Sequence, residues 1–217
     1  SKDKRISNIF KNAQTSITKP VTLAKILDTI NQLDWFSAKE EGLGDFYESL
    51  LEKTGSEGGK GAGQYFTPRE IIDLAVRIIK PKRGEIIQDP SLGTGGFIKS
   101  ANKYIKDNTD QLFDLKPNQI EFQKTKAYNG FELVPKVFYL FLMNMLLNDI
   151  DGNFFNKNTL TEDGKNLEKS DVILANPPFG VSTDESLMDR DDFLFQTNNK
   201  QLAFLQHIYR NLKPGGR

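Results

Sequence analysis

The chain has 217 residues, of which 37% are hydrophobic, so it can form one well-packed core with a small appendage. Its 29 basic and 29 acidic residues give zero net charge, which argues against gripping nucleic acid through bulk positive charge. With no cysteine and with His207 as the single histidine, a disulfide scaffold and most zinc or iron sites are excluded. No signal peptide or long apolar run is present, so we expect a cytoplasmic protein without a membrane segment or a metal.

Residues 1–53 are expected to form a small helical segment. Two apolar stripes recur at helical spacing and are interpreted as packing surfaces: Leu23, Ile26, Leu27, Ile30 and Leu33, then Leu43, Phe46, Tyr47, Leu50 and Leu51. Residues 54–63 (TGSEGGKGAG) predict a glycine-rich loop, acting as a linker or lid. They fail as a phosphate-binding loop, because Thr54 and Gly61 stand where that pattern needs Gly and Ser or Thr.

Residues 64–70 (QYFTPRE) predict the start of a helix that runs to Ile79. Thr67 and Glu70 have the spacing of a capping box, and Pro68 would occupy the favoured first helical position. The helix start offers backbone donors and the positive end of the dipole, which suit a carboxylate. Spacing alone favours an ordinary capped helix.

Residues 86–97 (IIQDPSLGTGGF) predict a strand, a tight glycine turn and a helix that continues to Ile105. Ile98 stands where the dinucleotide fingerprint requires Gly or Ala, so the turn is not a standard NAD loop. The following insert, residues 106–126, is polar and has no clear periodicity.

Residues 127–132 predict a second strand that ends in an acid. In a nucleotide-binding α/β fold such an acid hydrogen-bonds ribose hydroxyls, so Glu132 is the ribose candidate, with a solvated loop acid as the alternative. Pro135 begins a strongly apolar helix that should belong to the core. Residues 153–160 predict a short third strand, with Asn158 near its end.

Residues 171–175 predict a buried strand that stops at two prolines. Pro178 lacks a backbone donor and keeps the preceding residue extended, which leaves the carbonyls of Asn176 and Pro177 to face a ligand. The Asn176 amide oxygen is a further acceptor, and Phe179 offers a flat apolar surface. This set suits a planar group that carries an NH2; a cis-proline or other tight turn that closes a strand is the alternative.

The remaining residues complete the expected architecture. Residues 182–192 predict a solvated acidic loop, and residues 202–212 predict a helix in which His207 serves packing. The element order predicts a doubly wound parallel α/β sheet, with the glycine turn and the proline turn at the same carboxyl edge.

The Asn-Pro-Pro-Phe segment resembles the catalytic motif of the amino-group DNA methyltransferases, which methylate the 6-amino group of adenine. QYFTPREI and QDPSLGTGGF resemble the cofactor motifs of these enzymes, in the gamma order, with Leu92 where the family more often has a small residue or cysteine. Together with GDFYESLL and FLQHIYRNLKPGGR, they resemble the modification (M) subunit of type I restriction-modification systems, from about residue 40 onward.

The resemblance implies a Rossmann-like methyltransferase domain at residues 64–217, with the C-terminal strands of the fold missing, and S-adenosylmethionine as cofactor. The residues implied in catalysis are Asn176, Pro177, Pro178 and Phe179. Those implied in cofactor binding are Gln64, Tyr65, Phe66, Thr67, Pro68, Asp89, Pro90, Gly93, Thr94, Gly95, Gly96, Phe97, Glu132, Asn158 and Asn176.

The resemblance also implies a reaction and partners. A flipped adenine would stack on Phe179 while Asn176 and the Pro177 carbonyl hold its amino hydrogens and stabilise the charge that grows on nitrogen. In the family a specificity (S) subunit reads the DNA, and a second M subunit and a restriction (R) subunit are further expected partners. This division of labour would account for the zero net charge.

Two other functions stay open. A protein-glutamine methyltransferase handles a similar planar amide with an Asn-Pro-Pro motif, although the QYFTPREI and Gly-Gly-Phe segments argue against it. A non-catalytic module that binds only cofactor or partner subunits is the second.

Overall fold

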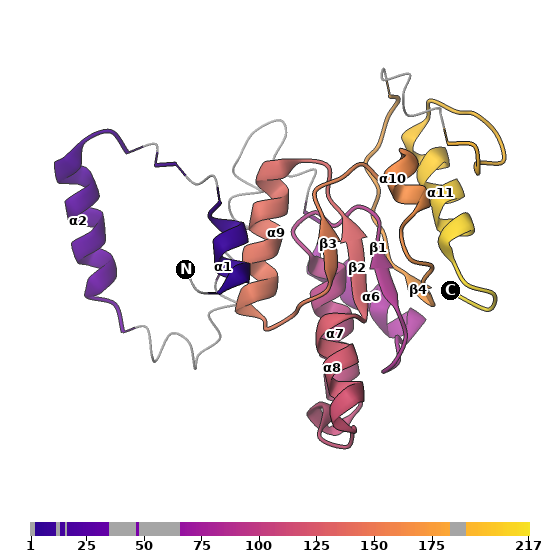
Figure 1. Ribbon diagram of the computed structural model, residues 1–217, viewed down its shortest axis with the longest axis horizontal. Coiled ribbons are helices and arrows are strands. Elements are labelled where there is room, and N and C mark those ends of the chain that lie inside the picture. Colours follow the sequence, from indigo (N-terminus) through magenta and orange to yellow (C-terminus); the bar gives the residue numbers. More distant parts are fainter. Residues whose placement is uncertain (1–2, 12–13, 16, 35–46, 48–65, 183–189) are drawn as a thin grey trace.

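A parallel four-stranded sheet organises the chain (Figure 1). The computed structural model describes residues 3–11, 14–15, 17–34, 47, 66–182 and 190–217. Strands β1 (Ile87–Asp89), β2 (Tyr128–Phe131), β3 (Asn153–Phe155) and β4 (Val172–Ile173) lie in the order β3-β2-β1-β4, with Ile87 opposite both Tyr128 and Val172. The direction of winding reverses beside β1, where open α/β sheets bind their ligands. The predicted doubly wound α/β fold is confirmed.

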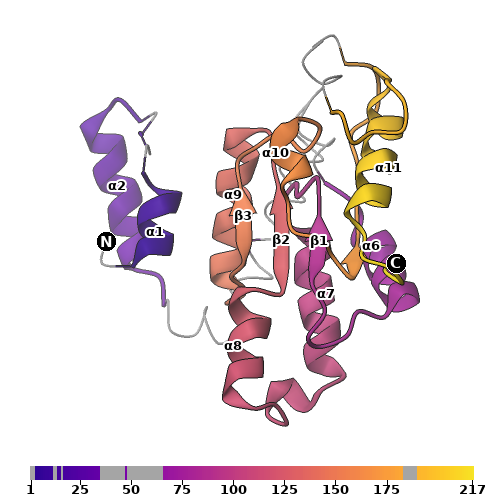
Figure 2. The same ribbon diagram turned by 45° about the vertical axis from the view of Figure 1, so that its right-hand side comes forward.

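Helices cover both faces of the sheet (Figures 1 and 2). Helices α6 (Arg69–Ile79), α7 (Gly96–Asp107) and α9 (Pro135–Leu147) supply one face with the large apolar core, which buries side chains such as Val76, Ile98, Phe141 and Met145. The other face carries α10 (Glu162–Lys165) and α11 (Lys200–Asn211) over a small cluster of Leu160, Ala203 and Phe204. All three residues of β1 are buried, which is typical of a central strand covered on both faces.

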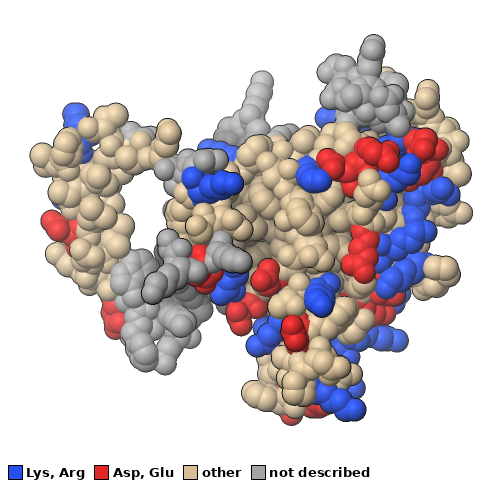
Figure 3. All heavy atoms as spheres, in the orientation of Figure 1, with Lys and Arg blue, Asp and Glu red and all other residues tan. Residues whose placement is uncertain are grey.

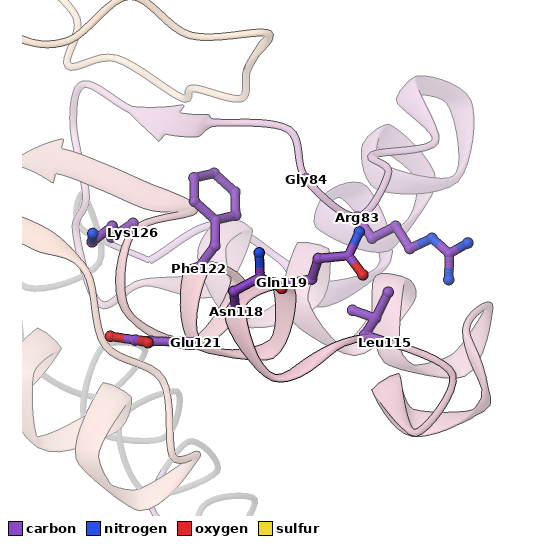
Figure 4. A pocket seen from close by; sticks show the side chains of 8 residues that line it. All are labelled: Arg83, Gly84, Leu115, Asn118, Gln119, Glu121, Phe122 and Lys126. Atoms are coloured by element: carbon purple, nitrogen blue, oxygen red, sulfur yellow. The ribbon is translucent and has the colours of Figure 1, made fainter.

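The polar insert at residues 106–126 contains two helices that its pattern did not indicate, η2 (Asp110–Leu112) and α8 (Pro117–Thr125). Helix α8 is anchored by polar contacts: Gln123 is buried and donates to the Tyr128 hydroxyl, which donates to Asn102. An open cavity of about 590 Å³ lies beside α8, at the amino-terminal edge of the sheet (Figure 4). None of the predicted site residues lines it.

The N-terminal part contains α1 (Lys4–Ile9), which lies against α9, and α2 (Pro20–Asn31). No residue of α2 is buried against the described part of the chain, so the expected packing of its apolar stripe is not found there (Figure 3). The second stripe, apart from Tyr47, and the glycine-rich loop lie outside the described residues. None of the described helices is both long and apolar enough to cross a bilayer.

The end of the chain returns to the sheet. The backbone N–H of Ile173 donates to the carbonyl of Arg217, and the N–H of Arg217 donates to the carbonyl of Asp171, each at 3.0 Å. This alternation is that of a parallel pair. Arg217 therefore pairs with β4 in the parallel direction.

Candidate functional site

A cavity of about 430 Å³ opens at the carboxyl edge of the sheet. It is lined by the segments that follow all four strands, together with the residues before α6 and the first turns of α11. The glycine turn and the proline turn therefore meet in one cavity, as predicted from the element order. This is the position at which a doubly wound sheet binds ligands.

Most of the predicted site residues line this cavity. They are Phe66, Thr67, Asp89, Pro90, Gly93, Thr94, Gly96, Phe97, Glu132, Asn158, Asn176, Pro177, Pro178 and Phe179. Pro68 and Gly95 do not line it; each is the residue immediately before a helix, α6 and α7 respectively. Gln64 and Tyr65 lie outside the described residues. The roles given to all of these residues stay predictions.

The glycine turn depends on backbone angles that favour glycine. Gly93 and Gly95 have φ angles of +52° and +90°. A Cβ at Gly95 would also lie 2.7 Å from Met145 Cε and 2.8 Å from the Phe141 ring. The turn is tied to α9 by the Asn144 amide, which donates to the Thr94 carbonyl at 2.8 Å. Gly95 thus packs against the core, whereas Gly93 and Gly96 bring the backbone to the cavity without a side chain.

Glu132 is buried at the end of β2 and faces the glycine turn. Its two carboxylate oxygens accept hydrogen bonds from the backbone N–H of Gly93 at 2.9 Å and of Val134 at 2.8 Å. Burial raises the pKa of the carboxyl group, and these backbone donors oppose the rise. The alternative of a solvated loop acid is therefore wrong. Contact with a ribose stays a prediction.

Asp89 is the second acid of the cavity, and it is almost fully buried. It accepts a hydrogen bond from the Ser91 backbone N–H at 2.9 Å. Burial, with a smaller contribution from the charge of Glu132, raises the pKa of Asp89 to about 7. A pair of buried acids that are costly to ionise favours a ligand carrying positive charge.

Replacing Asp89 by asparagine should change how stability depends on pH. Because the folded pKa of about 7 exceeds the unfolded value of 3.8, the stability from Asp89 is complete below pH 3.8 and is lost as pH rises through 7. An asparagine at this position does not titrate. As the pH rises from 5 to 8, the free energy of unfolding of Asp89→Asn, measured in urea, should increase relative to that of the wild type by on the order of a few kcal/mol. Parallel pH curves for the two proteins would contradict this assignment.

The proline turn leaves the sheet as predicted. After β4, the last ladder bond is that of the Leu174 N–H to the Gln88 carbonyl at 3.0 Å. Within the described part of the chain, the carbonyls of Asn176 and Pro177 accept no hydrogen bond. No cis peptide bond occurs in the described residues, so the cis-proline alternative is wrong. Phe179 is 78% exposed at the mouth of the cavity.

The capping box predicted at Thr67 and Glu70 is wrong. Helix α6 begins at Arg69 with Pro68 before it, and no side chain caps it. The Thr67 hydroxyl instead accepts a hydrogen bond from the Asn176 side-chain amide, with 3.0 Å between Oγ1 and Nδ2. The Thr67 hydroxyl bonds to Asn176 and does not cap α6, because the segment before α6 lies against the proline turn.

Beneath the proline turn a buried polar network supports the cavity. His207 is fully buried, with its Nε2 3.1 Å from Gln88 Oε1. Burial lowers its pKa to about 3, so the ring is neutral, and the predicted packing role is confirmed. Arg190 is also buried, against the prediction of a solvated loop at residues 182–192. Its guanidinium donates to the Thr159 carbonyl and pairs with Asp192, which holds residues 190–192 against the segment after β3.

Some lining residues carried no sequence signal. Lys200 and Phe204 reach the cavity from the first turns of α11, and Thr159 and Leu160 from the segment after β3. Apolar periodicity predicts only that Phe204 belongs to the core. Which side chains of α11 reach the cavity depends on how this helix is positioned against the proline turn. That position is fixed by tertiary contacts, such as the N–H of Lys200 donating to the Gly180 carbonyl.

The chain is similar to modification subunits of type I restriction enzymes. The methylase subunit of type I restriction enzyme StySPI from Salmonella potsdam is 42% identical over 99% of this chain, and that of EcoKI from Escherichia coli K12 is 41% identical over 99%. The crystal structure of the EcoKI M protein superposes with a TM-score of 0.67 at 36% identity, over 98% of this chain and 39% of that one. A type I methyltransferase subunit from Streptococcus thermophilus superposes with a TM-score of 0.72 at 25% identity, over 99% of this chain and 47% of that one.

The chain spans 42% of the length of each of the two curated relatives. The model of one protein family, N-6 DNA Methylase, matches residues 38–217, which include the glycine turn, the buried acids and the proline turn. The chain therefore belongs to the N-6 DNA methylase family.

Proposed function

We propose that this chain carries the catalytic centre of a site-specific adenine-N6 DNA methyltransferase, acting as modification subunit of a type I restriction-modification complex. The observation that carries the proposal is the meeting of the glycine turn and the proline turn in one cavity of about 430 Å³. One wall is acidic and shaped by glycine, and the opposite wall presents backbone and amide acceptors. This is the arrangement that transfer between a cationic cofactor and an amino group requires.

The residues present fit S-adenosylmethionine. Its sulfonium and amino groups are positive, which suits a wall that contains Asp89 and Glu132. Gly93 and Gly96 allow close approach of the backbone, Glu132 would meet the ribose, and Asn158 would meet the adenine end. Phe66, Thr67 and Phe97 would enclose the methionine end. When bound, the cofactor supplies an activated methyl group, so the protein's contribution is to position and polarise.

The proline turn would hold the second substrate. The amino group of a flipped adenine would donate to the Asn176 side-chain oxygen and the Pro177 carbonyl, which the described residues leave without donors. These acceptors draw the nitrogen lone pair out of conjugation and stabilise the positive charge that develops on it. Pro178 keeps the turn extended, and the exposed Phe179 ring would stack on the base. His207 takes no part, because it is buried on the other face of the sheet.

We also propose partner subunits and a division of the chain into three parts. The relatives are named as subunits of type I restriction enzymes, which supports assembly with a specificity subunit, a second modification subunit and a restriction subunit. With zero net charge, the chain needs such partners to hold DNA phosphates. Residues 1–53 would form an N-terminal helical segment, residues 54–63 a loop and residues 64–217 the catalytic part, and the complex would act in the cytoplasm.

Reconstitution tests the proposal. The protein is co-expressed with the products of adjacent open reading frames, and the purified complex is incubated with DNA and methyl-labelled S-adenosylmethionine. We expect label in N6-methyladenine at one DNA sequence motif. Label in a release-factor peptide instead would establish glutamine methylation, and S-adenosylmethionine binding without transfer to either acceptor would establish a non-catalytic module.

A further inference from the structure

We propose that Thr67 is a positioning residue for the amide of Asn176, and so sets the rate of methyl transfer. The inference rests on the proposed function, in which the Asn176 side-chain oxygen accepts a hydrogen bond from the target amine. It assigns to Thr67 a role on the target side of the cavity, in addition to its place in the wall beside the cofactor.

The contact joins two segments that are distant in sequence. Asn176 Nδ2 lies 3.0 Å from Thr67 Oγ1, and the two residues are 109 positions apart. Asn176 belongs to the exposed proline turn, whereas Thr67 stands just before α6. In the described part of the chain no other hydrogen bond restrains the Asn176 side chain, and the Thr67 hydroxyl makes no cap on α6. Each side chain is thus held by the other.

The chemistry of an amide gives this contact its consequence. A carboxamide has a donor end and an acceptor end, and only its oxygen can accept a proton from the target amine. When the oxygen faces the amine, the NH2 end needs an acceptor of its own, and Thr67 Oγ1 supplies one at hydrogen-bonding distance. Without it, the amide plane is free to rotate and the productive orientation leaves the NH2 end without a protein acceptor. The loss should appear in the transfer step, when charge grows on the target nitrogen.

The test uses the reconstituted complex with three single variants. Thr67→Val keeps the shape of the side chain but removes the hydroxyl, and Thr67→Ser keeps the hydroxyl. Thr29→Val, on the exposed helix α2, is the matched control, because its hydroxyl donates only to the Lys25 carbonyl of its own helix. For each, kcat and KM for DNA are measured together with calorimetric affinity for S-adenosylmethionine and the thermal unfolding midpoint.

We expect Thr67→Val to lower kcat roughly tenfold, the scale of one lost hydrogen bond. Its KM for DNA, its affinity for S-adenosylmethionine and its unfolding midpoint should stay near the wild-type values. Thr67→Ser should restore kcat, and Thr29→Val should leave it unchanged. In an Asn176→Ala background, Thr67→Val should cause no further loss, because the group that it positions is gone.

Three results would overturn the inference: an unchanged kcat in Thr67→Val, a loss of cofactor affinity as large as the loss of kcat, or equal losses with and without the Asn176 side chain. A different result identifies failure of the proposed function itself. If Asn176→Ala methylates adenine at the wild-type rate, Asn176 is not the acceptor and Thr67 has nothing to position.

Discussion

Replacing Asn176 by alanine should slow methyl transfer by orders of magnitude while leaving S-adenosylmethionine bound. The substitution removes the side-chain oxygen that accepts from the target amine but keeps the proline turn and its backbone carbonyls. Removing a preorganised group that stabilises developing charge lowers kcat by about 100-fold to 1,000-fold. The acidic wall with Asp89 and Glu132 is untouched, so cofactor affinity should stay within about twofold, since no bond to the acids is lost. Single-turnover transfer and calorimetry measure the two quantities.

The matched control is Asn118→Ala. Asn118 lines the other cavity, beside α8 at the amino-terminal edge of the sheet, and is exposed like Asn176 (Figure 4). This variant should transfer methyl groups at the wild-type rate. Equal rates for Asn176→Ala and the wild type would remove the proline turn from the mechanism, and a collapse of cofactor affinity in Asn176→Ala would show that Asn176 holds the cofactor instead.

Replacing Arg190 by methionine should lower the free energy of unfolding by about 3–5 kcal/mol, the cost of breaking a buried ion pair from one side. The Arg190 side chain is 1% exposed, and Nε and Nη2 lie 2.5 Å and 2.7 Å from the carboxylate oxygens of Asp192. Nη1 donates to the Thr159 carbonyl at 2.9 Å, and the guanidinium lies over the Phe193 ring. Methionine fills much of the same volume but leaves Asp192 and the Thr159 carbonyl without this donor. Urea unfolding measures the change.

Arg83→Met is the control for Arg190. Arg83 pairs with Asp114, but both side chains are more than 40% exposed, so the pair should contribute less than about 1 kcal/mol. Similar losses in the two variants would mean that the Arg190 network contributes no more than a surface pair. A large loss for Arg190→Met alone, accompanied by lower affinity for DNA, would show that this network supports the proline turn.

The sequence predicted the features that local chemistry determines. The strand that stops shortly before Pro177 and Pro178, the glycine turn at Gly93 and the acid after β2 each follow from residues adjacent in the chain. The rules of parallel winding then place their ends at one edge of the sheet. The architecture and the shared cavity were predictable for that reason, and the structure adds that Glu132 holds the glycine turn through the Gly93 N–H.

The features that sequence reasoning missed depend on tertiary contacts. Thr67 has the spacing of a capping residue, but its hydroxyl pairs with Asn176 instead. Helix α8 has little apolar periodicity, and its buried Gln123 accepts a hydrogen bond from the distant Gly84 N–H while donating to the Tyr128 hydroxyl. From the sequence, Arg190 is one charge of a solvated loop, whereas in the structure it is buried against His207 and Thr159. In each case a polar group bonds to a partner that is distant in sequence, and neither helix propensity nor apolar periodicity predicts such a contact.

We propose that cofactor and target meet in the cavity between the glycine turn and the proline turn. The most direct measurement is a crystal structure of the assembled complex with S-adenosylhomocysteine, the cofactor without its methyl group. We expect the ribose at Glu132, the amino end near Asp89 and the sulfur facing Asn176. Binding in the cavity beside α8, or a sulfur turned away from Asn176, would contradict it.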